Sequence, residues 1–232
     1  MVSPPRPDKN QNLLYPVFLK LTNFEILLVG GGSVALEKLN SVLSNSPDAR
    51  IHLVAPEIKQ EIEDLARIHS TVKIDLRKFI SEDLHNKSLV ICATDDNELH
   101  KHIKGLTTAS HQLLNVADTP ELCDFYLASI VQKGNLKIAI STNGLSPTGA
   151  KRIKESLNDA LPDSLDQILL NLNHLRSKLK GDFAYKIKKM NEATAALGLS
   201  HRSIEINKIT QVLIRLSAIL LSVLIGYFIG KR

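Results

Sequence analysis

Short apolar runs alternate with longer amphipathic segments over the first half of the chain. The runs are four or five residues long and lie at 26–29, 51–55, 72–76, 89–93 and 113–117. They predict buried strands, and the segments between them carry the spacing of helices. Strands that alternate with helices, several of them continuously apolar, predict a doubly wound, Rossmann-like parallel sheet with helices on both sides, ending near residue 117.

The pattern is different on either side of this α/β region. Residues 13–21, with Pro16 near their start, are typical of an edge strand. After residue 117, two strand-like runs at 125–131 and 136–141 flank a polar turn and predict a hairpin. Ser146-Pro147 is typical of a helix start, and a polar helical region follows, broken at Pro162 and Gly181.

The last part of the chain is strongly apolar. Residues 212–230 contain a single charge, Arg215, and residues 216–230 form an uncharged run of 15 residues. As a helix, the 19-residue segment would span roughly 28 Å, close to the hydrocarbon thickness of a bilayer. Tyr227 and the basic pair 231–232 suit a membrane interface. The pattern favours a membrane tail; a C-terminal helix buried in a dimer is the alternative.

Composition narrows the function classes. The net charge is +5 with 4% aromatic residues and no Trp, which argues against a nucleic-acid-binding protein and is compatible with an acidic ligand. Cys92 and Cys123 form no C-x-x-C motif and suit a reducing cytoplasm. His100 and His102 are two positions apart, so a helix would point them to different faces, and we expect no preformed metal site.

The glycine run that ends the first strand is the strongest single motif. Gly30 and Gly32, followed by Ser33, Val34 and Ala35, give the pattern G-x-G-x-x-A between a strand and a helix. In such a turn the second glycine lets backbone N–H groups approach a dinucleotide pyrophosphate at the helix N-terminus. An ordinary strand-to-helix loop is the alternative.

Acidic and hydroxyl side chains follow the other strands. Glu57, after Pro56, follows the second strand, where a carboxylate binds ribose hydroxyls and favours NAD over NADP. Alternatively, Glu57 occupies the first turn of a helix, where negative charge is favourable. Thr94 and Asp95 follow the fourth strand at the edge where open α/β sheets bind ligands. Either Asp95 or its neighbour Asp96 also suits a helix cap.

Two further places could carry chemistry. Asp118 follows the fifth strand, where a carboxylate could act as a general base beside a nicotinamide. Alternatively, its D-x-x-E spacing with Glu121 suits helix capping, with Thr119-Pro120 as the N-cap and the first helical position. Ser141, Asn143 and Ser146 offer hydroxyl and amide groups before a helix that bears basic residues, which suits an anionic ligand. A solvated loop is the alternative for this second place.

Together these segments resemble the siroheme synthase N-terminal family, which comprises precorrin-2 dehydrogenases, some of them also sirohydrochlorin ferrochelatases. The resemblance covers about residues 13–160 and rests on YPVFLKL (15–21), ILLVGGGSVALEK (26–38), VAPEI (54–58), ATDD (93–96), NVADTPELCDFYLASIV (115–131) and IAISTNGLSPTGAKRIKESL (140–157). The chain departs from the family at Ala128, where proline is frequent, at Leu145, where a polar residue is frequent, and at Gly149, where a β-branched residue is usual.

The resemblance implies a function. Asp118 matches the family's catalytic aspartate, and Ser33, Val34, Pro56 and Glu57 match positions that contact NAD. The implied reaction transfers a hydride from precorrin-2 to NAD⁺ and yields sirohydrochlorin, in a homodimer formed through residues 118–150. Insertion of Fe²⁺ stays open. The alternatives are a membrane-tethered, NAD-binding regulatory protein without catalysis and an oxidoreductase that acts on another substrate.

The expected organisation has four parts. They are an NAD-binding domain at 1–117, a dimerisation and active-site β element at 118–150, a helical region at 151–211 and a possible transmembrane tail at 212–230. The catalytic part is expected in the cytoplasm.

Overall fold

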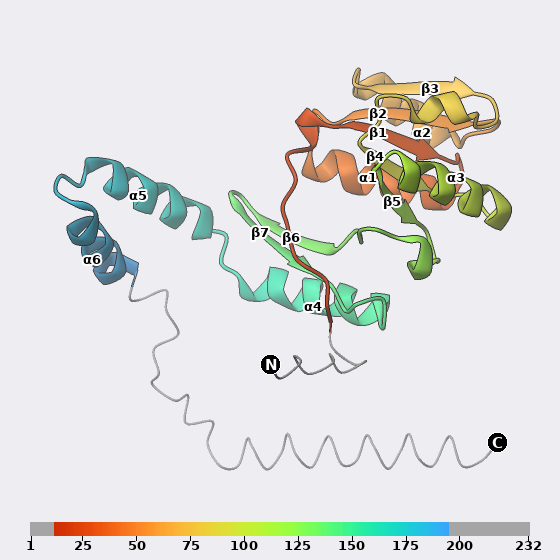
Figure 1. Ribbon diagram of the computed structural model, residues 1–232. Helices are drawn as coiled ribbons and strands as arrows, with labels where there is room; N and C mark the ends of the chain where they lie inside the picture. The colour runs from red at the N-terminus through yellow and green to blue at the C-terminus, as the bar shows by residue number, and fades with distance from the viewer. Residues whose placement is uncertain (1–11, 195–232) are drawn as a thin grey trace, which may run out of the picture. The chain divides into compact units, whose positions relative to one another are not determined.

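A five-stranded parallel sheet is the centre of the structure, a computed structural model that describes residues 12–194. Its strands are β1 (Glu25–Val29), β2 (Arg50–Ala55), β3 (Val72–Leu76), β4 (Leu89–Cys92) and β5 (Leu113–Val116), in the order β3-β2-β1-β4-β5 (Figure 1). The chain runs outward from β1 to β3, then returns to β4 on the other side of β1. The switch point, where such sheets bind ligands, therefore lies between β1 and β4.

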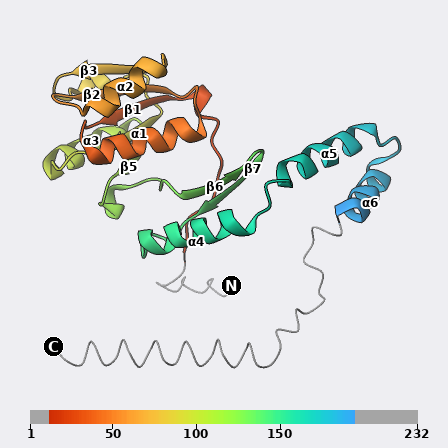
Figure 2. The same ribbon diagram turned by 180° about the vertical axis from the view of Figure 1, so that it is seen from behind.

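Helices cover both faces of the sheet, as the sequence predicts. Helices α1 (Ser33–Asn45) and α2 (Gln60–Ile68) cover one face, seen in front in Figure 2, and α3 (Asn97–Ala109) covers the other with the short helix η2 (Ser81–Leu84). Alternate residues of β1 serve the two faces: Ile26 and Leu28 pack toward α1, whereas Leu27 and Val29 pack toward α3. All four side chains are at most 2% exposed, which explains their uninterrupted apolar run.

One predicted strand does not form, and the predicted start of α2 is wrong. Residues 13–20 belong to no helix or strand and Leu21 begins a short 3₁₀ helix, so the expected edge strand is absent from the described chain; Leu13, Tyr15 and Phe18 are 71%, 87% and 69% exposed. Helix α2 begins at Gln60 rather than at Pro56, because residues 56–59 form a loop that lies against the glycine run. The Lys59 N–H donates to the Gly31 carbonyl at 3.0 Å, which fixes this loop.

The predicted hairpin and helices follow the sheet. Strands β6 (Ser129–Lys133) and β7 (Leu136–Ile140) are joined at Gly134-Asn135, where Gly134 has a φ of +55°. The first strand starts later than expected, because the Phe125 carbonyl already accepts a bond from the Asn115 side chain. Short helices η1 (Leu21–Asn23) and η3 (Pro120–Leu122) flank the sheet region in sequence. Helices α4 (Pro147–Ala160), α5 (Leu165–Lys178) and α6 (Phe183–Thr194) end or begin near Pro162 and Gly181, as predicted.

The described residues form two compact units. One contains residues 12–132 and 137–161, so α4 belongs with the sheet; the other contains residues 133–136 and 162–194. Within the second unit, Lys133 pairs with Asp163 at 2.7 Å, and the Asp166 carboxylate accepts the Asn135 N–H at 2.7 Å. Among residues 12–194, no helix is long and apolar enough to cross a membrane. The expected tail at 212–230 lies outside the described residues.

Candidate functional site

The glycine run meets the loops that follow β2 and β4. Gly30 has a φ of +123°, and a Cβ there would collide with the Ala93 carbonyl oxygen and lie 3.2 Å from Thr94 Cγ2. A Cβ on Gly31 would collide with the Glu57 carbonyl oxygen. The structure therefore brings the predicted residues Gly30, Glu57 and Thr94 together at the carboxyl edge of the sheet. The sequence motif treats Gly31 as variable, and its close packing against Glu57 was not predicted.

Gly32 faces open space at the start of α1. No atom of the described chain lies within 4 Å of a Cβ built on Gly32, in contrast to Gly30 and Gly31. Gly32 is the N-cap of α1, no side chain caps this helix, and its first turn contains no acidic residue. The first backbone N–H groups of a helix have no partner within the helix. The backbone N–H groups of Ser33 and Val34 are therefore available to an anion, in the place where the motif predicts a pyrophosphate.

Glu57 lies in the loop between β2 and α2, and its side chain is exposed. It precedes the first residue of α2 by three positions, so the alternative that it occupies a first helical turn is wrong. The backbones of Glu57 and the exposed neighbour Pro56 are held against the glycine run through Gly31. The Glu57 carboxylate is thus available at the edge of the sheet next to the open space at Gly32.

The residues after β4 divide between capping and lining the edge. The Asp96 carboxylate caps α3 by accepting the Leu99 N–H at 2.9 Å, whereas Asp95 is exposed. Asp96 is thus the capping residue of the two. The Thr94 hydroxyl lies 2.9 Å from Nε2 of the buried His100, a contact that the sequence did not predict. His102 is exposed, so the two histidines lie on different faces of α3, as expected.

Asp118 stands at the same edge in an unusual backbone conformation. It follows Ala117, whose N–H donates to the Cys92 carbonyl at 2.9 Å and so continues β5 beside β4. Asp118 is exposed and has a φ of +56°. The left-handed region costs an L-residue roughly 1 kcal/mol, although Asp and Asn tolerate it best. Thr119 is the N-cap of η3 and Pro120 its first residue, as the alternative predicts, but no side chain caps that helix, so a capping role for Asp118 is wrong.

Hydrogen bonds join the chain segment before Asp118 to the segment after it. The Asp124 N–H donates to the Leu114 carbonyl at 2.7 Å, and its carboxylate accepts the Leu114 N–H at 3.0 Å. The side-chain amide of Asn115 donates to the Phe125 carbonyl at 2.8 Å. Because its base is fixed in this way, the loop can keep Asp118 in a strained conformation. The buried Asn115 in an otherwise apolar strand was the sequence signal for this anchor.

The loop after β7 is bonded mainly within itself. Asn143 has a φ of +55°, and its N–H donates to Ser141 Oγ at 3.2 Å. Ser146 Oγ accepts the Gly149 N–H at 3.0 Å and caps α4, as the sequence predicts. Ser141, Asn143 and Ser146 are exposed, as are the basic residues Lys151 and Arg152 of α4. In the described chain, no hydrogen bond joins this loop to Asp118, so its role as a substrate site stays a prediction.

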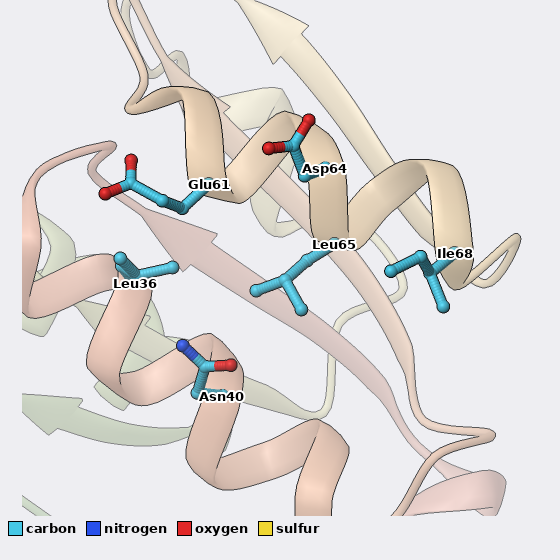
Figure 3. Close-up of a pocket in the computed structure, with 6 residues that line it drawn as sticks. All are labelled: Leu36, Asn40, Glu61, Asp64, Leu65 and Ile68. Carbon is cyan, nitrogen blue, oxygen red and sulfur yellow. The ribbon is translucent and has the colours of Figure 1, made fainter.

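A hollow between α1 and α2 is not suited to a dinucleotide. It has a volume of about 290 Å³ and is lined by Leu36, Asn40, Glu61, Asp64, Leu65 and Ile68 (Figure 3). Two of these residues, Glu61 and Asp64, are carboxylates, which would repel phosphate groups. The candidate site is therefore the carboxyl edge of the sheet and not this hollow.

A cluster of ionisable residues lies around β3. His52, Asp75 and Asp83 place ligand-type atoms within 4.8 Å of one another. However, the Arg77 guanidinium donates to Asp83 at 2.8 and 2.6 Å and to Asp75 at 2.8 Å. It thus already supplies the positive charge that a metal ion would bring to these carboxylates. Burial alone would raise the pKa of Asp83, but bonds from Arg77 and the Ile80 N–H outweigh it and lower the pKa. The cluster is an ion-pair network that fastens the η2 loop to the sheet.

Comparisons with known proteins agree with this geometry. Residues 17–129 match a family described as putative NAD(P)-binding, and residues 133–160 match the central region of the sirohaem biosynthesis protein. The siroheme synthase of Pseudoalteromonas translucida is 35% identical over 170 residues, which cover 73% of this chain and 35% of that protein. The siroheme synthase of Nitrosococcus oceani is 32% identical over 165 residues, which cover 71% and 35% respectively.

A solved structure extends the likeness to the fold. The structure titled SirC, precorrin-2 dehydrogenase, matches with a TM-score of 0.65 and 29% sequence identity, over 80% of this chain and 94% of that chain. The chain spans about a third of the length of the curated relatives it matches, 35% for the two named above. Two family matches in the expected order, the aligned siroheme synthases and the shared fold lead to one conclusion: the chain belongs to the siroheme synthase N-terminal family.

Proposed function

We propose that this protein is an NAD-dependent precorrin-2 dehydrogenase that forms sirohydrochlorin in siroheme biosynthesis. The observation that carries the proposal is the position of Asp118, an exposed carboxylate held at a φ of +56°. It lies at the same sheet edge as the uncapped start of α1. The names of the relatives, siroheme synthase and precorrin-2 dehydrogenase, supply the substrate class.

Each part of the edge has a role in this reaction. The backbone N–H groups after Gly32 bind the pyrophosphate, and Glu57 accepts hydrogen bonds from the ribose hydroxyls. NAD⁺, when bound, accepts the hydride. The Asp118 carboxylate accepts the proton that precorrin-2 loses, so two electrons and one proton leave as hydride and a second proton leaves through Asp118. Open space beside Gly32 and the absence of an acidic residue in the first turn of α1 fit the cofactor.

Anaerobic turnover tests the proposal. Purified protein is mixed with precorrin-2 and NAD⁺, and NADH formation is followed together with the tetrapyrrole spectrum. We expect one NADH for each sirohydrochlorin formed, and weaker activity with NADP⁺. Normal NADH binding without turnover of precorrin-2 would contradict the proposal and favour a regulatory protein or another substrate.

We propose Fe²⁺ insertion into sirohydrochlorin as a second reaction of the same site. An exposed carboxylate such as Asp118 can accept the pyrrole protons that the metal displaces, while the macrocycle nitrogens bind the metal. Addition of Fe²⁺ to the anaerobic product should accelerate siroheme formation above the rate without protein. An unchanged rate would restrict the protein to the dehydrogenase step.

The assembly is proposed to be a homodimer with a membrane-anchored tail. The proposed interface is formed by residues 118–150. Exposed apolar side chains at Leu13, Tyr15 and Phe18 also favour a partner surface, and the apolar sequence at 212–230 supports the anchor. Analytical ultracentrifugation should give twice the mass of the chain. Fractionation should place the full chain with membranes and a version ending at Gln211 in the soluble fraction. The catalytic part is proposed to lie in the cytoplasm. A monomer, or equal solubility of both versions, would contradict these two proposals separately.

A further inference from the structure

Thr94 lies beside the glycine run, in the loop that follows β4. Its Cγ2 lies 3.2 Å from the position of a Cβ on Gly30, so the residue lines the edge between β1 and β4. Its Oγ1 lies 2.9 Å from Nε2 of His100, which is on α3. The Asp96 N–H also points to this oxygen, at 3.4 Å. Thr94 is therefore oriented by the structure behind it before any ligand binds.

His100 is buried and has one ring nitrogen without a partner. The side chain is 2% exposed, and no group of the described chain bonds its Nδ1. Burial lowers the pKa of His100 and outweighs the nearby charges of Asp96 and Asp95 and a hydrogen bond with the Thr94 backbone, all of which would raise it. The imidazole is consequently neutral near pH 7 and carries a single proton, on either Nδ1 or Nε2.

The missing partner determines which nitrogen carries that proton. A proton on Nδ1 would bury a donor that has no acceptor, which costs more than leaving a lone pair unpaired. The proton therefore belongs on Nε2, and His100 donates to Thr94 Oγ1. Because this oxygen then accepts from His100 and from the Asp96 N–H, the hydroxyl proton of Thr94 must point elsewhere. Among the described residues, no hydrogen bond gives this proton an acceptor, which leaves it to a ligand at the edge.

We propose that His100 is a positioning residue that makes the Thr94 hydroxyl a hydrogen-bond donor to an oxygen of the bound dinucleotide. The inference rests on the proposed NAD site; it gives Thr94 a defined contact with the cofactor and adds His100, which acts behind it. A purely structural histidine is the competing explanation. A histidine that only fastens α3 to the β4 loop would change stability when replaced and leave the affinity for NADH unchanged.

A double-mutant cycle on NADH binding tests this inference. The variants are Thr94→Val, His100→Leu and the double variant, and NADH fluorescence titration measures the dissociation constant without any tetrapyrrole. The chain contains no Trp, so cofactor fluorescence is free of tryptophan energy transfer. We expect each single variant to weaken binding about fivefold to tenfold, the range for one hydrogen bond. The double variant should be no weaker than either single variant, because both remove the same interaction.

Further variants separate positioning from folding. His100→Gln returns a donor near the place of Nε2 and should recover part of the affinity, and Thr94→Ser should bind nearly as the parent does. His102→Leu changes an exposed histidine of the same helix and should leave binding unchanged. Should His100→Leu not fold, His100→Gln and Thr94→Val still decide, since the proposal requires Thr94→Val to weaken binding and His100→Gln to bind more tightly than Thr94→Val. A two-bond ¹⁵N–¹H spectrum should find the His100 proton on Nε2.

Three results would overturn the inference. They are parent-like NADH binding by a folded His100→Leu, losses that add in the double variant, and a proton on Nδ1. Failure of the parent protein to bind NADH is a separate outcome, because it would contradict the proposed cofactor site itself. Parent binding with unaffected variants would leave the proposed function intact and remove only the role of His100.

Discussion

Gly31 and Gly32 are neighbours, but the addition of one methyl group should affect different properties at the two positions. It should lower the stability at Gly31 and the affinity for the cofactor at Gly32. A Cβ on Gly31 would collide with the Glu57 carbonyl oxygen and lie 2.8 Å from Ile58 Cγ2, so the two loops must move apart. Overpacking of this kind costs about 1–3 kcal/mol. Gly32 has φ −84° and ψ −164°, which an L-residue adopts, and a Cβ there has no neighbour within 4 Å. Gly32→Ala should therefore change stability by less than about 1 kcal/mol.

The affinity for the cofactor should change in Gly32→Ala, the variant whose stability is expected to stay nearly the same. The methyl group of Gly32→Ala occupies the space assigned to the pyrophosphate, and we expect NADH binding to weaken at least about tenfold, which corresponds to about 1.4 kcal/mol. Urea unfolding gives the stability of both variants, and NADH fluorescence titration gives the dissociation constant. A folded Gly32→Ala that binds NADH like the parent would refute the assignment of this space to the pyrophosphate. Gly31→Ala with unchanged stability would refute the close packing of the loops.

Three further predictions concern other parts of the chain. Glu57→Ser should weaken NADH binding and narrow the preference for NADH over NADPH, measured by paired titrations; an unchanged ratio would exclude Glu57 from ribose recognition. The lowered pKa of Asp83 means that its contribution to stability is complete above the pKa of the unfolded chain and is lost as the pH falls through the lower folded value. The free energy of unfolding, measured with urea, should thus change less between pH 7 and pH 3 for Asp83→Asn than for the parent. An equal change in both proteins would contradict the ion-pair network. Asp118→Ala should be about 1 kcal/mol less stable than Asp118→Asn, because Asn tolerates a positive φ; equal thermal stability would argue against strain at this residue.

The fold was predictable because the buried strands appear in the sequence as short runs of apolar residues. The β1 run at 26–29 is apolar at every position, since its side chains alternate between two covered faces. The apolar residues at 13–21 misled for the same reason: their pattern indicates burial, but no strand of the described chain pairs with them. Pattern alone does not distinguish a strand from an extended segment that lacks a neighbour.

The site was only partly predictable. Positions next to strand ends placed Gly32, Glu57, Thr94 and Asp118 at one edge, because parallel strands share their carboxyl ends. Side-chain contacts that join a loop to a neighbouring helix or strand were not predictable from spacing. The bond from His100 to Thr94 spans the start of a helix, and Asp124 fastens β5 ten residues away along the chain. Such contacts depend on tertiary packing, which motif spacing does not record.

The central claim is that Asp118 performs proton transfer at the edge where the dinucleotide binds. The most direct measurement compares the parent protein with Asp118→Asn in anaerobic single turnover of precorrin-2 with NAD⁺, after NADH titration of both. Asn preserves the size of the side chain and tolerates the positive φ but accepts no proton. We predict equal NADH affinity and thermal stability, with the rate of NADH formation lowered at least about a hundredfold. A variant that binds NADH and turns over like the parent would contradict the account.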